Sequence, residues 1–386
     1  MDHSFHHHQG MGLMSKFRTL TPGEPGPSFA QRSAANPRYA FASAAGRYLV
    51  LCFFHSAAQA AARATLDAAF ARPDLFNDRV ASFFGVSTDP TDESEARVAN
   101  RTPGYRFFWD FDLSVSRLYG AAPRKPDGED LRRGLWVVLD PTMRVIDTFA
   151  VTRDHEDLPR LFACLDAQPP PDRFSGISLQ APILYLPRVF EPAFCQRLVD
   201  LYDAQGGTAS GFMRQIDGKT VGLNDPRHKS RSDVLIDDPD LISEVQGHIR
   251  HRVIPEIAKV HQFHATRMER YLIGCYEAQQ GGHFAPHRDN TTSGTAHRRF
   301  AISVSLNEDF DGGEVSFPEY GPQGFKAPLG GAVVFSCSLL HAVSRVTRGR
   351  RYGFLPFVYD DAAARIRKAN RHLLDKPPQQ SHAAGG

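Results

Sequence analysis

One histidine and aspartate pair in the C-terminal half has the spacing of a metal site. His287, Arg288 and Asp289 follow one another, and in an extended strand the first and third of three residues point to the same face. An imidazole and a carboxylate would therefore lie side by side. A third ligand must come from another segment, and His341, which follows the apolar run 331–336, is the candidate. We predict that His287, Asp289 and His341 bind one metal ion.

Arg351, which follows these three residues in the sequence, suggests which co-substrate the metal site would use. Two histidines and one carboxylate cover one face of a metal and leave its other positions open, as in non-haem Fe(II) oxygenases. Arg351 lies ten residues after His341, where a returning strand would bring its planar guanidinium, which suits a carboxylate, into the same cavity. A His-x-Asp tripeptide arises easily by chance among 17 histidines. Arg351 therefore narrows the co-substrate to a dicarboxylate.

Other residues near this motif have simpler interpretations. The pairs 312–313 and 330–331 are glycines that do not open a helix, which favours turns of a sheet over phosphate-binding loops. Cys337 could be a thiol nucleophile with a histidine as its base, but no third orienting group is evident. His283 and His297 could touch a substrate, although solvent-facing loop positions are the simpler expectation.

Three segments together resemble the prolyl 4-hydroxylase-like branch of the 2-oxoglutarate oxygenases, over about residues 180–360. They are CYEAQQGGHFAPHRDN, LNEDFDGGEVSFPEYG and GGAVVFSCSLLHAVSRVTRGRRY. The resemblance implies that His287, Asp289 and His341 hold Fe(II), and that Arg351 pairs with the C5 carboxylate of 2-oxoglutarate. It also implies O2 as the oxidant, release of succinate and CO2, and ascorbate as a possible reductant.

The same resemblance implies two further site residues. Tyr276 is similar in place to the tyrosine that precedes the His-x-Asp motif in this family and hydrogen-bonds 2-oxoglutarate. Arg299, with Arg298 as the alternative, matches a polar position that faces the active cavity in relatives.

The elements that must position these residues follow from apolar periodicity. Glu191-Pro192 begins an amphipathic helix, and the apolar residues of 241–257 recur every four positions, with Pro255 as a kink or break. From Arg270 onward, short strands separated by Gly- and Asp-containing turns predict a double-stranded β-helix, or jelly roll, with flanking helices. The polar, basic segment 206–232 is expected to be a loop that forms a lid or binding segment.

Upstream of residue 168 the pattern alternates strands with helices, as an α/β domain requires. Apolar runs at 47–54, 80–87, 134–140 and 145–149 predict strands, and helices are predicted at 56–71 and 89–98. The segments VLCFF, SFFGVSTDP, WDFDLSVSRLYG and GLWVVLDPTMRVIDTF resemble the thioredoxin-like core of the peroxiredoxins.

The chemistry of that family is missing at the matching place. Its peroxidatic cysteine follows the first strand, where this chain has residues 55–62 (HSAAQAAA) and no thiol. Cys52 lies inside the apolar strand and is expected to be a core residue. This domain is therefore interpreted as a redoxin fold without peroxidase activity, retained for docking, substrate recognition or support of its neighbour.

A proline-rich stretch, Gln168-Pro169-Pro170-Pro171-Asp172, favours an extended linker between the two domains. The leader contains His6, His7 and His8, which we interpret as part of a polar extension rather than as a metal site. The predicted parts are a disordered leader (1–19), a thioredoxin-like domain (20–167), a linker (168–176), an oxygenase domain (177–362), and a C-terminal helix and tail (363–386).

Composition limits the partners. Hydrophobic residues make up 41%, charged residues 23%, and the formal net charge is +2, so neither a nucleic acid nor a membrane partner is expected. The N-terminus lacks the apolar run of a secretory signal, which makes a cytoplasmic location the default. The five cysteines contain no Cys-x-x-Cys pair and are expected to be reduced. The oligomeric state cannot be predicted from these features.

Taken together, the motifs predict a dioxygenase that hydroxylates an aliphatic C–H bond in a prolyl or other peptide side chain. A free amino acid or a natural product is the alternative substrate. A thiol redox protein or a non-catalytic scaffold built on the redoxin-like domain is the alternative function. The attached redoxin-like domain favours a peptide or protein partner, which it would dock.

Overall fold

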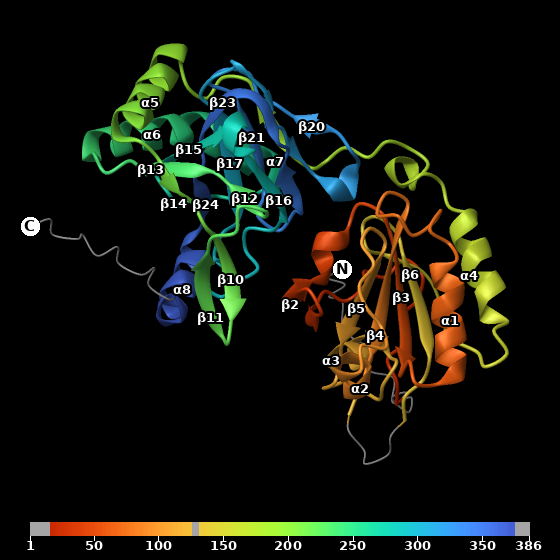
Figure 1. Cartoon of the computed structure of the whole chain (residues 1–386). Coiled ribbons are helices and arrows are strands. Elements are labelled where there is room, and N and C mark those ends of the chain that lie inside the picture. The colour runs from red at the N-terminus through yellow and green to blue at the C-terminus, as the bar shows by residue number, and fades with distance from the viewer. Residues whose placement is uncertain (1–15, 126–130, 375–386) are drawn as a thin grey trace, which may run out of the picture. The chain divides into compact units, whose positions relative to one another are not determined.

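The computed structural model describes residues 16–125 and 131–374. The chain divides near Leu179 into two compact units, and each is described by itself (Figure 1). The predicted leader residues 1–15, with their three consecutive histidines, and the tail residues 375–386 lie outside the described residues. No helix in the described ranges combines the length and apolar content needed to cross a bilayer.

Two predictions about the ends of the N-terminal domain need correction. Residues 16–19 were expected to be disordered, but Phe17 forms a β-bridge with Pro123 and lies under the guanidinium of Arg133, 4.7 Å from its ring centroid. The linker was expected to be extended, but Pro171–Arg173 forms a 3-10 turn, which the fixed φ of proline allows at its first position. The domain boundaries themselves stay a prediction.

The N-terminal unit is built on a seven-stranded sheet with the order β2-β1-β5-β4-β3-β6-β7. The central strands β3, β4 and β5 are parallel, and β6 and β7 return antiparallel. The strands are β1 (Ala30–Ser33), β2 (Asn36–Ala40), β3 (Tyr48–His55), β4 (Ala81–Ser87), β5 (Tyr105–Trp109), β6 (Leu135–Leu139) and β7 (Val145–Ala150). The helices are α1 (Ala60–Phe70), α2 (Pro90–Ser94), α3 (Ser114–Tyr119) and α4 (Asp157–Asp166).

This strand order is that of the thioredoxin-like fold, which confirms the predicted fold class. A parallel β3–β4 pair is connected through α1, and the β6–β7 hairpin lies beside β3. Helices α1 and α4 lie along one side of the sheet in Figure 1 and share its core. The helix predicted over 89–98 ends at Ser94, because Ala96 adopts a left-handed φ of 51°.

The thiol of the N-terminal unit is a core residue, as predicted. Cys52 is fully buried between Gly85 and Trp136 on the adjacent strands, and burial raises the pKa of its thiol well above the usual value. After β3, where a peroxiredoxin has its reactive cysteine, the Ala57 N–H donates to the buried carboxylate of Asp92. All five cysteines are free among the described residues.

Two large antiparallel sheets and one two-stranded hairpin occur among the described residues of the C-terminal unit. The larger sheet has the order β14-β24-β17-β23-β15-β13-β9, with β18 on β23, β21 on β17 and β8 on β21. Its strands are β8 (Leu184–Leu186), β9 (Thr208–Ala209), β13 (Ser232–Leu235), β14 (Arg267–Glu269), β15 (Leu272–Glu277), β17 (Phe300–Ser305), β18 (Phe310–Gly312), β21 (Ala332–Ser336), β23 (Val346–Phe354) and β24 (Phe357–Tyr359).

The smaller sheet carries the metal-site histidines and has the order β12-β16-β22-β19-β20. Its strands are β12 (Lys229–Ser230), β16 (His283–His287), β19 (Val315–Ser316), β20 (Gly324–Phe325) and β22 (His341–Val343). The two antiparallel sheets make the predicted jelly roll. Its flanking helices are α5 (Pro192–Gln205), α6 (Pro239–Arg252), α7 (Ile254–His261) and α8 (Asp361–Ala369).

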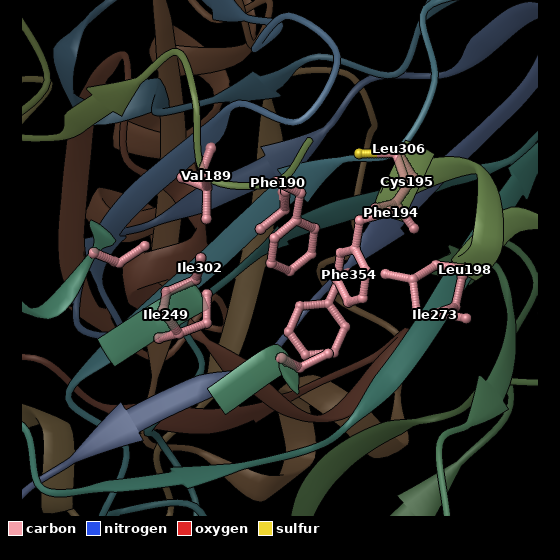
Figure 2. Close-up of a cluster of buried hydrophobic side chains, with 14 of the residues drawn as sticks. Val189, Phe190, Phe194, Cys195, Leu198, Ile249, Ile273, Ile302, Leu306 and Phe354 are labelled. Atoms are coloured by element: carbon pink, nitrogen blue, oxygen red, sulfur yellow. The ribbon is translucent and has the colours of Figure 1, made fainter. Parts of the chain in front are cut away.

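One hydrophobic core joins the helices to the larger sheet, and Figure 2 shows part of its side chains. Phe194 and Leu198 of α5 and Ile249 of α6 pack against residues of β15, β17 and β23. The apolar residues that recur every four positions in 241–257 predicted which face of α6 is buried. The predicted break near Pro255 is real, because α6 ends at Arg252 and α7 begins at Ile254.

The segment 206–232 is not the loop that we expected. It contains β9, β12 and a hairpin formed by β10 (Phe212–Ile216) and β11 (Lys219–Leu223). The hairpin turn is Asp217-Gly218, and both residues have positive φ, 46° and 78°. An Asp-Gly pair between two short strands is a typical hairpin signal, and it was present in the sequence.

Candidate metal centre

The two histidines of the predicted site face each other across two strands. His287 at the end of β16 is the register partner of His341 at the start of β22, and their ring centroids are 4.2 Å apart. Asp289 lies two residues beyond β16, where its backbone N–H donates to the Cys337 carbonyl at 3.0 Å. A loop contact therefore positions the carboxylate, rather than the extended strand that the His-x-Asp spacing suggested.

The structure brings all three predicted ligands together. The Nε2 atom of His287 lies 3.6 Å from Asp289 Oδ1, and that of His341 lies 3.3 Å from Asp289 Oδ2. One ligand atom from each of the three residues lies within 4.8 Å of the others. Two imidazole nitrogens and one carboxylate at these separations form the donor set that suits Fe(II).

Backbone carbonyls set the tautomer of both histidines. His287 Nδ1 is 2.9 Å from the Ala285 carbonyl, and His341 Nδ1 is 3.1 Å from the Leu339 carbonyl. A carbonyl only accepts, so each Nδ1 must donate its proton there. Each Nε2 then carries the lone pair and can bind the metal. Metal-binding histidines usually donate their other ring N–H to a protein acceptor in this way.

The protonation states also suit a metal. Burial, together with the neighbouring His287, lowers the pKa of His341 to about 4. Burial alone would raise the pKa of Asp289, but His341 and His287 hold it well below its usual range. Near neutral pH, His341 is therefore an uncharged imidazole and Asp289 is an ionised carboxylate, which are the forms that bind metal.

Aromatic side chains surround the two imidazoles. Phe284 stacks on the ring of His287 with centroids 3.5 Å apart, and Phe335 lies 4.5 Å from the ring of His341. Phe317 completes this wall at 6.4 Å from His341. These rings hold the imidazoles in place and give them apolar neighbours.

Arg351 lies in the interior of the C-terminal unit and is placed to bind an anion. It is buried on β23, opposite Tyr276 of β15, and its Cζ lies 5.1 Å from the Tyr276 ring centroid. Its Nη2 donates to Ser303 Oγ at 2.8 Å, but its buried Nη1 has no hydrogen-bond partner among the described residues. A buried unpaired donor on a guanidinium is costly. One carboxylate of 2-oxoglutarate could accept a hydrogen bond from this Nη1.

Tyr276 is held by a residue pair that the sequence interpretation missed. Arg231 Nη1 lies 3.5 Å from the Tyr276 hydroxyl, and the Arg231 guanidinium is paired with Asp233 at 2.6 Å. Tyr276 therefore lies between two arginines, Arg231 and Arg351. The alternation of charged residues at 229, 231 and 233 was a weak signal that one face of this segment is charged.

Arg298 and Arg299, the two alternatives from the sequence, make different contacts. Arg298 Nε donates to Glu269 at 2.8 Å, and its charge contributes to the low pKa of Asp289. Arg299 Nη1 instead donates to the Ala296 carbonyl at 2.9 Å. The first choice, Arg299, thus makes a local backbone contact, and a substrate role for either residue stays a prediction.

The neighbouring histidines are not solvent-facing, in contrast to our simpler expectation. His283 is buried with its ring nitrogens 2.7 Å from the Gly281 carbonyl and 3.0 Å from the Arg227 carbonyl. His297 is buried against Glu269 at 2.9 Å. Both have partners within the fold, so their burial has a structural reason.

The remaining residues near the motif fit the simpler interpretations. Burial and the charge of Asp289 raise the pKa of Cys337 well above its usual value, which argues against a thiol nucleophile. Gly312 ends strand β18, and Gly330 lies in a turn. At Gly330, with a φ of 72°, a Cβ atom would lie 2.1 Å from the Phe190 carbonyl oxygen, so this turn requires glycine.

The sequence around this site matches a known family model. Residues 271–359 match the model of the 2OG-Fe(II) oxygenase superfamily, and this range includes the three ligands, Tyr276 and Arg351. A PKHD-type hydroxylase of Synechococcus sp. (strain JA-2-3B'a(2-13)) is 36% identical over 94 residues, which is 22% of this chain and 41% of that protein. The chain therefore spans about two fifths of the length of that curated relative.

Solved structures similar to the chain include members of two families. A Pseudomonas putida prolyl-4-hydroxylase is 14% identical, with a TM-score of 0.36, over 47% of this chain and 94% of that chain. Xanthomonas campestris Peroxiredoxin Q is 17% identical, with a TM-score of 0.31, over 36% of this chain and 90% of that chain.

Proposed function

We propose, on the premise that the C-terminal unit carries a 2OG-Fe(II) oxygenase domain, that this protein is a 2-oxoglutarate-dependent dioxygenase. It hydroxylates an aliphatic C–H bond in a prolyl or other peptide side chain and releases succinate and CO2. One observation carries the proposal. The unpaired Nη1 of buried Arg351 lies in the same domain interior as a complete set of two histidines and one carboxylate. The PKHD-type hydroxylase similarity supports the reaction class.

The residues of the chain have separate tasks in this reaction. His287, Asp289 and His341 would hold the iron from one side, with both Nδ1 protons fixed on backbone carbonyls. Bound Fe(II) would supply the activation of O2 at the expense of 2-oxoglutarate. Arg351, supported by Ser303, would hold the distal carboxylate and so orient the co-substrate.

The protein also excludes water from the reacting groups. Phe284, Phe317 and Phe335 form the apolar wall around the imidazoles. An apolar surrounding strengthens the electrostatic hold on the co-substrate and prevents side reactions with water. Tyr276, between Arg231 and Arg351, would add a hydrogen bond to 2-oxoglutarate.

The N-terminal unit would serve substrate recognition. Its fold is thioredoxin-like, but the place of the reactive cysteine is occupied by a hydrogen bond between Ala57 and Asp92, and Cys52 is buried. Thiol chemistry in this unit is therefore disfavoured. We infer a docking role for a peptide or protein partner of the oxygenase domain.

The test is Fe(II)-dependent succinate formation from 2-oxoglutarate. The variant His341→Ala removes one of three ligands and is expected to abolish succinate formation, whereas His251→Ala, an exposed position on α6, leaves it unchanged. Addition of Co(II) should raise the Tm of the wild-type protein but not that of His341→Ala, because binding to the folded state stabilises it. Normal turnover by His341→Ala would refute the assignment.

A further inference from the structure

Four guanidinium groups and three carboxylates form one electrostatic cluster beside the candidate metal centre. The charges of Asp289, Arg231 and Arg298 all influence the pKa of Arg270, and the charge of Arg231 also influences the pKa of Arg351. The guanidinium groups belong to Arg231, Arg270, Arg298 and Arg351. The carboxylates belong to Asp233, Glu269 and Asp289.

The positive charge in this cluster exceeds the negative charge. Lys229 is not counted, because burial and the nearby Arg231 lower its pKa to about 6, and its Nζ is hydrogen-bonded to Ser210 Oγ and the Gly211 carbonyl, both at 2.7 Å. The charges of Fe(II) and of the 2-oxoglutarate dianion cancel. Four arginines against three carboxylates then leave an excess of positive charge, and Arg367, 3.1 Å from Glu269, adds to it.

The pairing pattern assigns that excess to Arg270. Arg298 pairs with Glu269 at 2.8 Å, and Arg231 pairs with Asp233 through two hydrogen bonds of 2.6 and 2.7 Å. Arg351 is assigned to 2-oxoglutarate. The ion pair of Arg270 within the described chain is a 3.4 Å contact with Asp233, whose carboxylate already belongs to Arg231.

Arg270 is also the accessible member of the cluster. Its side chain keeps 30% of its surface exposed, whereas Arg231 keeps 6% and Arg298 keeps 10%. Its Cζ lies 5.8 Å from the ring centroid of Phe357, a ring that Arg298 also contacts at 4.1 Å. Phe357 thus holds two like charges close to each other, an arrangement that an anion would stabilise.

The backbone of Arg270 has a positive φ angle. Its φ is +66°, in the left-handed region that is unfavourable for a residue with a side chain. Such backbone conformations cluster at binding and catalytic sites. Burial, followed by the charges of Arg231 and Arg298, lowers the pKa of Arg270 to about 10. The two neighbouring guanidinium groups therefore repel the charge of Arg270.

We propose that Arg270, together with Arg231, forms a second anion-binding subsite that holds a carboxylate of the primary substrate. The substrate of this oxygenase is then an acidic compound. This inference rests on the proposed function, since a primary substrate is defined only for an oxygenase. The carboxylate can belong to a free amino acid or similar small acid, or to an acidic peptide, because both present the same group.

The deciding experiment uses a matched pair of small probes. The full chain, loaded anaerobically with Fe(II) and 2-oxoglutarate, is titrated with acetate and with its neutral counterpart acetamide, and binding is followed by calorimetry. With Arg351 occupied by 2-oxoglutarate, acetate reports on the remaining cation. We expect acetate to bind at least about tenfold more tightly than acetamide, a difference of about 1.4 kcal/mol.

Three variants test the role of Arg270. Arg270→Asn removes the charge with a residue that tolerates a left-handed φ, and it should lower acetate affinity at least about tenfold. Arg270→Lys keeps the charge and should retain part of the affinity. Arg267→Gln, at an exposed arginine paired with Asp361, is the control and should bind acetate as the wild type does. Equal acetate binding by wild type and Arg270→Asn, or no preference over acetamide, would overturn the proposal.

Background succinate formation separates this inference from the proposed function. Co(II) together with 2-oxoglutarate should raise the Tm of Arg270→Asn as it raises that of the wild type, which shows that the variant folds. A wild-type protein without Fe(II)-dependent succinate formation would instead contradict the oxygenase assignment. Stimulation of succinate release by free amino acids identifies a small acid as substrate, and stimulation by acidic peptides identifies a peptide. Equal stimulation by the corresponding amides would overturn the subsite.

Discussion

His287 and His341 are register partners on two antiparallel strands, with ring centroids 4.2 Å apart, although 54 positions separate them in the sequence. The metal position therefore depends on one register between β16 and β22. A slip of a single residue would turn His341 to the opposite face of its strand. The pairing of Phe284 with Val343 and the irregularity before His287 hold this register.

Arg351 should control the affinity for 2-oxoglutarate. Replacement by Gln removes the buried charge and its charge-assisted hydrogen bonds, which contribute about 1.5–3 kcal/mol each. We expect the KM for 2-oxoglutarate to rise at least about tenfold, equivalent to about 1.4 kcal/mol, while metal affinity stays unchanged. Arg351→Lys should recover part of the loss, because it keeps the charge without the planar fork.

The control for Arg351 is its neighbour Arg350 on the same strand. The Arg350 side chain is 55% exposed and pairs with Glu277 on the other face of β23. Arg350→Gln should therefore leave the KM for 2-oxoglutarate unchanged. Similar KM values for Arg351→Gln and Arg350→Gln would count against the assignment of the distal carboxylate.

Glu269 should stabilise the C-terminal unit as the partner of several cations. It accepts from Arg298 at 2.8 Å and lies 2.9 Å from His297 Nε2 and 3.1 Å from Arg367. Glu269→Gln leaves buried cations without their carboxylate and should lower the free energy of unfolding by about 3–5 kcal/mol, as measured by urea unfolding at pH 7. Glu256→Gln, at an exposed pair with Lys259, should change it by less than about 1 kcal/mol.

The same carboxylate should make stability depend on pH. Burial would raise the pKa of Glu269, but the hydrogen bond to His297 and the charge of Arg298 lower it to about 2. A folded-state pKa below the unfolded value near 4.3 gives a stability contribution that is fully present above that pH. It is lost as the pH falls towards 2, by up to about 3 kcal/mol. Glu269→Gln should lack this part of the acid dependence; an unchanged profile would contradict the assignment.

The hairpin β10–β11 should be fastened by two polar contacts. Gln215 Oε1 accepts from the Ser293 N–H at 2.8 Å, and Thr220 Oγ1 accepts from the Gly294 N–H at 2.9 Å. Thr220→Val leaves the Gly294 N–H unpaired, at a cost of about 1–3 kcal/mol. We expect faster tryptic cleavage at Lys219 on the hairpin.

An exposed threonine provides the comparison for the hairpin variant. Thr347 lies exposed on β23, so Thr347→Val should leave the rate of tryptic cleavage unchanged. If Thr220→Val is cleaved no faster than this control, the contact with Gly294 does not fasten the hairpin.

Cys52 should be unreactive in the folded protein. Burial raises the pKa of its thiol well above the usual value, and it lies between two strands of the sheet. Iodoacetamide should therefore label Cys52 only after unfolding, whereas the half-buried Cys164 is labelled earlier. Mass spectrometry of the alkylated peptides measures both rates. Rapid labelling of Cys52 in the folded state would revive a thiol function for this unit.

Much of the site was predictable because its signals are local in the chain. His-x-Asp, the later histidine and the arginine ten residues on are residue types at short spacings, and the helices follow from a four-residue apolar period. The hairpin turn Asp217-Gly218 was equally local, but the polar composition of its surroundings favoured a loop and hid it. These features depend on neighbours within a few residues.

The sequence by itself determined the donor types of the metal centre, the guanidinium for a dicarboxylate and the missing thiol of the N-terminal unit. Only the tertiary structure decided that Arg298 rather than Arg299 pairs with Glu269, that Arg231 supports Tyr276, and that Arg270 shares the carboxylate of Asp233 with Arg231. The reason is physical. Such contacts depend on which strands pair and in which register, and strand pairing joins residues that lie far apart in the chain.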